Sequence, residues 1–300
     1  MTAPSVAVED ARVITRTRSI RRLISDLGPV PTIAAVIIGA FLLMAGLADV
    51  VAPHDPLATS LRDRLRPPSW LEGGSGDYLL GTDALGRDIL SRVIHGSRTS
   101  LLVAAFALSI GLGVGLVVGV VSGLLGGVVD ATLMRVVDVM LSLPIILLAL
   151  IFVVTLGPGT LNVILAVGLV LWARFARIIR GEVLVLREAA FVDLARVAGA
   201  STIRLIMRHV LPNIANTVLV MATLQVGFVI IVEASLSFLG AGVPVPTPAW
   251  GSMIAEGREY VVTAWWLTVW PGVATMLVVL AFNFFGDWLR DELDPRLSQL

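Results

Sequence analysis

The chain has 300 residues, of which 57 % are hydrophobic and 15 % charged, and it contains no Cys. Soluble domains carry about 25 % charged residues, so this composition excludes a disordered chain, a disulfide scaffold and a Cys-ligated metal site. The 22 acidic residues are balanced by 22 basic ones, all of them Arg. Because Lys is absent, the chain lacks the P-loop signature GxxxxGK[ST] and is not itself a standard nucleotide-hydrolysing subunit.

Long uncharged stretches predict an all-α integral membrane protein. A bilayer core about 30 Å thick needs roughly 20 apolar helical residues. Stretches without Asp, Glu or Arg cover residues 27–48, 99–129, 139–173, 209–232 and 260–286. The turn signal Gly157-Pro158-Gly159 divides the longest of them into two helices. We therefore predict six transmembrane helices, at 30–50, 100–125, 136–156, 160–178, 214–240 and 264–286.

Charge asymmetry predicts the orientation of these spans. Five Arg residues precede the first span: Arg12, Arg16, Arg18, Arg21 and Arg22. By the positive-inside rule, residues 1–29 form a cytoplasmic tail, and six spans return the tail 289–300 to the same side. The cytoplasmic segments then hold 15 Arg and 11 acidic residues, and the external segments hold 7 Arg and 9 acidic residues. The first apolar run starts late and lacks an early cleavage site, so we expect it to stay in the membrane.

Residues 51–98 form an external segment between the first two spans. Its end, from Arg87 to Arg98, places four apolar residues on one helical face: Ile89, Leu90, Val93 and Ile94. This pattern predicts a helix that lies in the membrane interface or packs on the spans. Residues 99–288 form the remaining five-helix domain. Its first span contains a four-residue glycine repeat that predicts a helix-packing face: Gly111, Gly115, Gly119, Gly123 and Gly127.

The cytoplasmic loop 179–212 is predicted to fold as helix, turn, helix. The first helix covers 182–198, Gly199 takes the left-handed position, and Ser201 caps a second helix that ends before Pro212. A similar pattern occurs in DNA-binding helix-turn-helix motifs. Here the adjoining spans hold the two helices against the membrane and leave no room for a duplex, so no nucleic-acid partner is expected.

Within the spans, the candidate for a functional side chain is an acidic one. Glu233 interrupts the fifth span, and intramembrane charges commonly mark a transport pathway. Glu233 could instead be solvated near the outer interface or pair with another subunit. Asp138 is expected to be structural and paired with Arg135. The three His residues are scattered without HExxH spacing, and no GxSxG elbow occurs, so enzymatic activity is not expected.

A cytoplasmic signature carries a family resemblance. The signature reads EAA, three residues, Gly, nine residues, Ile-x-Leu-Pro; this chain has Asp193-Leu194-Ala195, then Gly199, then His209-Val210-Leu211-Pro212 with matching gaps. Asp replaces Glu, Leu replaces the first Ala and His replaces Ile. Further matching blocks are Gly81 to Asp88 leading to Ser91-Arg92, Glu233 to Gly240, Pro248 to Met253 and Gly286 to Pro295. The chain thus resembles permease subunits of binding-protein-dependent type I ABC importers, in the dipeptide/oligopeptide (peptide/nickel) permease C branch.

The resemblance implies a type I permease fold and a division of labour between subunits. The helix with the signature would dock on a separate ABC ATPase, which places Asp193, Leu194, Ala195, Arg196, Gly199, Ala200 and Arg204 at the coupling contact. This chain would bind no cofactor, because ATP and Mg²⁺ belong to one or two ATPase subunits. A homologous permease would complete a heterodimer in the lipid of a bacterial cell membrane.

An extracytoplasmic binding protein would deliver the substrate, which the resemblance suggests is a di- or oligopeptide. Nickel chelates and glutathione-like molecules are the alternatives within the same architecture. An ion-driven secondary transporter is the rival from another class. Such a transporter is expected to show more ionisable residues in its spans and an internal repeat.

Overall fold

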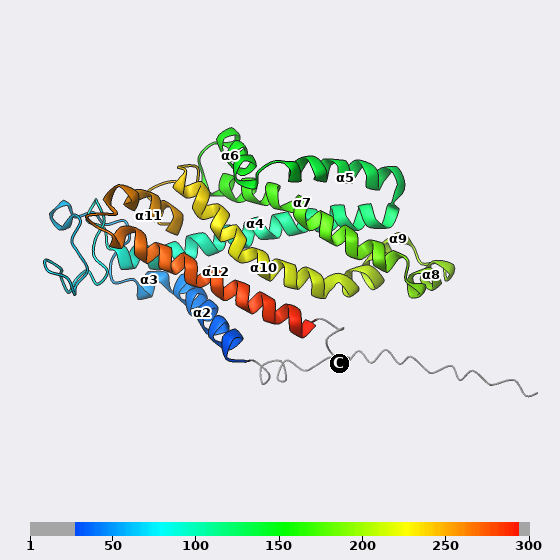
Figure 1. The fold of residues 1–300 in the computed structure, drawn as a ribbon, viewed down its shortest axis with the longest axis horizontal. Helices are drawn as coiled ribbons and strands as arrows, with labels where there is room; N and C mark the ends of the chain where they lie inside the picture. The colour runs from blue at the N-terminus through cyan, green and yellow to red at the C-terminus, as the bar shows by residue number, and fades with distance from the viewer. Residues whose placement is uncertain (1–27, 294–300) are drawn as a thin grey trace, which may run out of the picture.

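The computed structural model of the protein describes residues 28–293, and Figure 1 shows these residues folded as an elongated bundle of helices. Within this range the extended pairing is limited to a single bridge between Thr82 and Asp88. The all-α prediction is therefore confirmed. The Arg cluster of the N-terminal tail and residues 294–300 of the C-terminal tail lie outside the described residues.

Helices long and apolar enough to cross a membrane form the body of the described chain. Five pass this test: α2 (Pro29–Gly46), α4 (Ile89–Leu125), α7 (Thr160–Arg187), the Thr202–Phe238 helix that includes α10 (Leu211–Phe238), and α12 (Trp266–Leu293). A sixth crossing is reached if α5 (Gly127–Ser142) and α6 (Ile145–Leu156) count as one bent span. As predicted, Gly157 ends α6 and the next helix begins at Thr160.

The third span is not the continuous helix predicted at 136–156. α5 and α6 are separated by Leu143 and Pro144 and are bent by 95° relative to each other. Proline has no backbone N–H and disfavours helical geometry at the residue before it, and Leu143 is accordingly extended. α6 therefore turns away from the line of α5 and packs against α7 (Figure 1).

α4 and α7 pack closely along the predicted glycine face. A Cβ on Gly115 would lie 2.5 Å from the Cβ of Phe175, and one on Gly119 would lie 2.8 Å from the Ala176 carbonyl oxygen. Gly111 and Gly123 meet α7 in the same way, so four of the five glycines form the packing face. Gly127 does not belong to it, because it begins α5 at φ +55° with open space around it.

The helix predicted at the end of the external segment is the first part of α4. Asp88 caps it by accepting a hydrogen bond from Ser91 N at 2.9 Å. Ile89 and Val93 are buried, which favours the packed alternative, and Arg92 is buried as well. Arg87 and Asp88 are also buried against protein, so the contacts support packing on the bundle, and a position in the membrane interface stays a prediction. At 1.5 Å per residue the 37-residue α4 is about 55 Å long, so it extends beyond a bilayer core.

The bundle carries different structures at its two ends (Figure 1). One end, called the distal end here, contains residues 52–88, including the short helix η1 (Leu61–Asp63), together with α11 (Trp250–Gly257) and η3 (Arg258–Tyr260). The short helix α3 (Ala48–Val51) joins α2 to this end. The opposite end contains α8 (Ala190–Val197) and α9 (Thr202–Leu205).

Candidate functional site

The segment with the cytoplasmic signature begins where α7 ends. α7 continues to Arg187, and the chain then turns through an extended Ala189 (φ −78°, ψ 138°) before α8. The single helix predicted over 182–198 is therefore wrong. The turn places Val192 in the protein interior, where it is fully buried.

The bend after α8 agrees with the prediction at Gly199. Gly199 adopts φ +78°, a conformation that side chains with a Cβ rarely take. The Ala200 amide donates to the Ala195 carbonyl at 3.0 Å, which satisfies one of the last carbonyl groups of α8. Ser201 is the predicted cap, with its hydroxyl accepting from Arg204 N at 3.3 Å.

The second helix does not end before Pro212. α9 passes into a π-helical turn, η2 (Ile206–Val210), and this turn passes directly into α10. Pro212 directly follows this π-helical turn, and a local π adjustment is one way in which a continuous helix tolerates a proline. α9 and α10 are consequently joined into one 37-residue helical unit, Thr202–Phe238.

Apolar side chains are exposed around the α8–α9 turn. Leu194 is 69 % and Val197 87 % exposed, and Ile203 is exposed next to them. Among the other predicted coupling residues, Asp193, Arg196, Gly199 and Arg204 are exposed, whereas Ala195 and Ala200 are half-buried. Arg196 donates to Asp193 at 3.1 Å. We call Leu194, Val197, Ile203, Arg196 and Arg204 the coupling surface. Apolar residues exposed together with charged ones at the end of a bundle are typical of a protein contact.

Glu233 lies near the other end of the same helical unit and is fully buried. Its Oε1 accepts from the Ser237 hydroxyl at 2.7 Å, and its Oε2 accepts from the Ser100 hydroxyl at 3.4 Å. Ser100 in turn accepts from Trp250 N at 3.4 Å. Glu233 is therefore neither solvated nor open to another subunit here; it joins α10 to α4 and, through Ser100, to α11.

An ion-pair cluster at the distal end joins the segment 52–88 to α11. Glu256 Oε2 accepts from Arg87 Nη2 at 2.7 Å and from Arg92 Nη2 at 3.0 Å. Arg87 Nε also donates to Asp83 at 2.5 Å. The Arg92 side chain is 1 % exposed. Sequence reasoning grouped Asp83, Arg87 and Arg92 as parts of a matching block and missed Glu256, which stands three residues beyond another such block.

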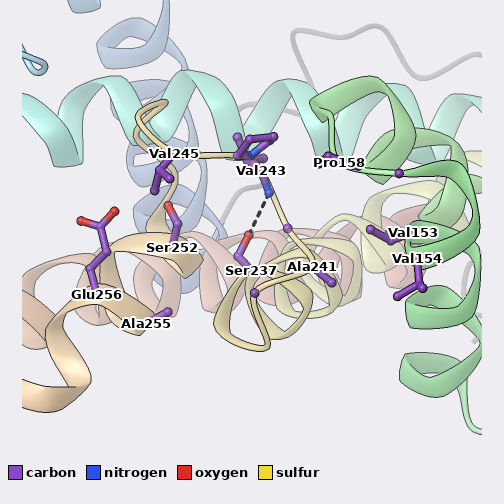
Figure 2. A pocket seen from close by; sticks show the side chains of 14 residues that line it. Val153, Val154, Pro158, Ser237, Ala241, Val243, Val245, Ser252, Ala255 and Glu256 are labelled. Carbon is purple, nitrogen blue, oxygen red and sulfur yellow. Dashed lines mark hydrogen bonds between the residues drawn. The ribbon is translucent and has the colours of Figure 1, made fainter.

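A cavity of about 480 Å³ opens beside this cluster. It lies between the end of α6, the Gly157-Pro158 turn, the end of α10, the loop 240–245 and α11 (Figure 2). Ser237 lies on its wall, and the dashed line in Figure 2 marks the hydrogen bond that Ser237 accepts from Val243 N at 3.3 Å. Glu233 does not line the cavity, but it holds the serine that does.

Asp138 has a different partner from the one predicted. It forms an ion pair with Arg177 of α7 rather than with Arg135. Both side chains are about half exposed, so this pair ties α5 to α7 at the surface of the described bundle.

Comparisons with known proteins agree with the geometry. Residues 115–299 match the family described as binding-protein-dependent transport system inner membrane component. The chain is 46 % identical over 249 residues to the di/tripeptide transport system permease protein DppC of Pseudomonas aeruginosa (strain UCBPP-PA14), covering 83 % of this chain and 82 % of that protein. It is 46 % identical over 259 residues to the dipeptide transport system permease protein DppC of Escherichia coli (strain K12), covering 86 % of each chain.

One further relative matches the chain over almost its whole length, and one solved structure matches its fold. A putative peptide transport system permease protein of Brucella suis biovar 1 (strain 1330) is 41 % identical over 298 residues, covering 98 % of this chain and 93 % of that protein. Among solved structures, an inward-facing MetNI methionine ABC transporter chain matches with a TM-score of 0.56 at 19 % identity. That match covers 67 % of this chain and 96 % of the other, and it shows a shared fold.

Proposed function

The chain belongs to the family of binding-protein-dependent transport system inner membrane components, and from that premise we propose that it is the permease subunit of an ATP-driven ABC importer for di- or oligopeptides. The observation that carries this function is the 41–46 % identity, over most of the chain, to permeases named for peptide transport. These names favour peptides over nickel chelates or glutathione-like molecules. The type I fold and the family favour an ABC importer over an ion-driven secondary transporter.

Transport in this proposal depends on partners that supply energy and substrate. The chain is a transport subunit without a cofactor of its own, and ATP and Mg²⁺ bind in one or two separate ABC ATPase subunits. A homologous permease subunit completes the pathway as a heterodimer. The distal end faces outward and receives peptide from an extracytoplasmic binding protein. The protein is then a multi-pass protein of a bacterial cell membrane with both termini in the cytoplasm.

The coupling surface is the proposed contact with the ATPase. Leu194 and Val197 present apolar area that loses water on docking. Arg196 and Arg204 flank this area and can meet acidic groups of the partner. Because α8 is joined to α7 through a short turn and to α10 through Gly199 and α9, movement of α8 is transmitted to both long helices.

The far end of the Thr202–Phe238 unit connects this movement to the pathway. At 1.5 Å per residue the unit is a lever about 55 Å long. Its last turns hold Glu233 and Ser237, and Ser237 lines the distal cavity. Glu233 is thus proposed to shape the translocation pathway through Ser237 rather than by touching the substrate in this conformation.

The experiment that tests the function is reconstitution of the chain with its partner permease, ATPases and binding protein in proteoliposomes. We expect uptake of a labelled dipeptide that requires ATP and the binding protein. Uptake driven by an ion gradient without ATP would establish the rival transporter class. Uptake of nickel chelates with no peptide uptake would overturn the peptide assignment.

A variant pair at Gly199 tests the coupling role in the same vesicles. Gly199→Val places a β-branched side chain at φ +78°, where it is strained although the space is open. We expect normal insertion, continued ATP hydrolysis and loss of most peptide uptake. Gly199→Asn is the matched control, because Asn tolerates the left-handed region, and it should keep most of the uptake. Equal uptake by the two variants would contradict the coupling role of this turn.

A further inference from the structure

We propose that Glu256 and the distal cavity beside it form a subsite for the amino terminus of the transported peptide. This inference rests on the proposed function and deepens it by stating which end of the peptide this chain recognises. It is carried by the shape of the cavity, the orientation of one carboxylate and the charges around it.

The cavity has the size and lining of a small-molecule site. Ligand pockets measure about 300–1,000 Å³ and combine apolar walls with a few polar groups, and this cavity of about 480 Å³ falls in that range. Most of its walls are apolar side chains from α6, the loop 240–245 and α11: Val153, Val154, Pro158, Val243, Val245 and Ala255. The polar side chains that line it are Ser237, Ser252 and Glu256.

The Glu256 carboxylate is held in one orientation through one of its two oxygens, and the other oxygen is left without a hydrogen-bond donor among the described residues. Its Oε2 receives both guanidinium hydrogen bonds, from Arg87 and Arg92. Among the described residues no donor meets Oε1, and the side chain remains 30 % exposed. Figure 2 shows the carboxylate at the edge of the cavity, on the same side as the Ser252 hydroxyl. Oε1 is therefore an acceptor that the two arginines leave available to a bound group.

The charges around the carboxylate favour a cation. Arg87 and Arg92 form ion pairs with Asp83 and Glu256, and a third carboxylate, that of Asp88, is buried in the same part of the protein. Two guanidinium groups therefore stand against three carboxylates, and His54 lies 3.5 Å from the Asp88 carboxylate. A peptide α-ammonium is a compact cation with three N–H donors, and a charge-assisted hydrogen bond to a carboxylate suits it.

The lining also excludes two other kinds of ligand. A divalent metal ion needs several oxygen or nitrogen ligands, and the cavity wall has one carboxylate and two hydroxyl groups. Among residues 28–293 no Arg or His lines the cavity, so the carboxyl end of a peptide finds no counter-charge from these residues there. The subsite should therefore bind the amino end of a peptide and make no specific contact with its carboxyl end.

The absence of Cys from this chain allows a direct occupancy assay. Ala255→Cys places a single thiol on the cavity wall beside Glu256. The assembled transporter, without binding protein, is labelled with a maleimide, and protection by added peptide is read on this chain after the subunits are separated. We expect a dipeptide and its carboxyl-terminal amide to slow the labelling, whereas the N-acetylated dipeptide gives no protection.

The carboxylate is tested in the same background. Glu256→Gln should raise the dipeptide concentration for half-protection by about tenfold, as expected when a charge-assisted hydrogen bond is lost. Glu259→Gln removes an equal charge from an exposed neighbour outside the cavity and should leave protection unchanged. Val262→Cys, 96 % exposed and also outside the cavity, should be labelled equally with and without peptide.

The outcomes separate this inference from the proposed function. Equal protection by free and N-acetylated dipeptide, or unchanged protection in Glu256→Gln, would overturn the subsite. If Glu256→Gln fails to assemble, the comparison of free with N-acetylated dipeptide decides alone. Dipeptide uptake by the reconstituted importer without any protection at Ala255→Cys would overturn the subsite and leave the function standing. If the reconstituted importer shows no dipeptide uptake and Ala255→Cys shows no protection, the proposed function is overturned as well.

Discussion

Ser237 lies one turn after Glu233 on α10, and its hydroxyl donates to Glu233 Oε1 at 2.7 Å. Both side chains are buried. The same hydroxyl accepts from Val243 N and lies on the cavity wall. Glu233 therefore fixes the rotamer of Ser237 and, with it, the loop 240–245 that covers one side of the cavity. The sequence suggests that Glu233 is a pathway ligand, and we propose instead that it acts through Ser237.

Glu233→Gln and Glu233→Leu should separate the charge from the hydrogen bonds. Gln keeps an acceptor for Ser237, so we expect intact assembly with reduced peptide uptake. Leu leaves Ser100 and Ser237 without their acceptor, at about 1–3 kcal/mol for each buried unsatisfied group, so assembled yield should fall as well. Size-exclusion profiles and uptake kinetics provide the measurements. Unchanged uptake kinetics in Glu233→Gln would show that the charge has no part in transport.

Arg92→Met should destabilise the protein far more than Arg98→Met. Arg92 is buried and faces Glu256 and Asp83, and breaking a buried ion pair by removing one partner costs about 3–5 kcal/mol. Arg98 pairs with Asp49 at the surface, where both side chains are well exposed, so its loss should change little. Thermal unfolding of the purified protein in detergent compares the two. Equal midpoints would show that the distal cluster is not a stabilising contact.

Gly115→Ala should disrupt the bundle, and Gly113→Ala should be tolerated. The new methyl group at Gly115 would lie 2.5 Å from Phe175 Cβ and 2.7 Å from the Trp172 carbonyl oxygen, so α4 and α7 would have to separate. At Gly113 the same methyl group meets nothing within 4 Å. We expect a loss of folded yield in the first variant alone. Similar yields would mean that α4 and α7 do not depend on close backbone approach.

Single thiols test the orientation, because the chain has no Cys of its own. Val262 near the distal end is 96 % exposed, and Val197 at the opposite end is 87 % exposed. In intact cells a membrane-impermeant maleimide should label Val262→Cys and leave Val197→Cys unlabelled. Inside-out vesicles lacking the ATPases should label Val197→Cys. The reverse pattern would place the termini outside and remove the coupling surface from any cytoplasmic ATPase.

Local features allowed much of the coupling segment to be predicted. Gly199 is left-handed and Ser201 caps the next helix, because turns and caps depend on residues close in sequence. Helix continuity was harder to predict. α7 continues past the expected boundary, and α9 runs through a π-helical turn into α10 in spite of Pro212. The predicted third span, in contrast, breaks at Pro144. Packing therefore decides which of the prolines and glycines in the sequence end a helix.

The amino-acid sequence by itself determined that this is a helical membrane protein with a signature-bearing turn and a glycine packing face. Span length, apolarity and small-residue spacing are properties of single segments, so they can be read without knowing what each segment contacts. Only the tertiary structure decided what the buried charges do. Glu233 meets Ser100 across 133 positions, and Glu256 meets Arg92 across 164 and Arg87 across 169. Such pairings depend on how α4, α10 and α11 pack together, and no local pattern encodes them.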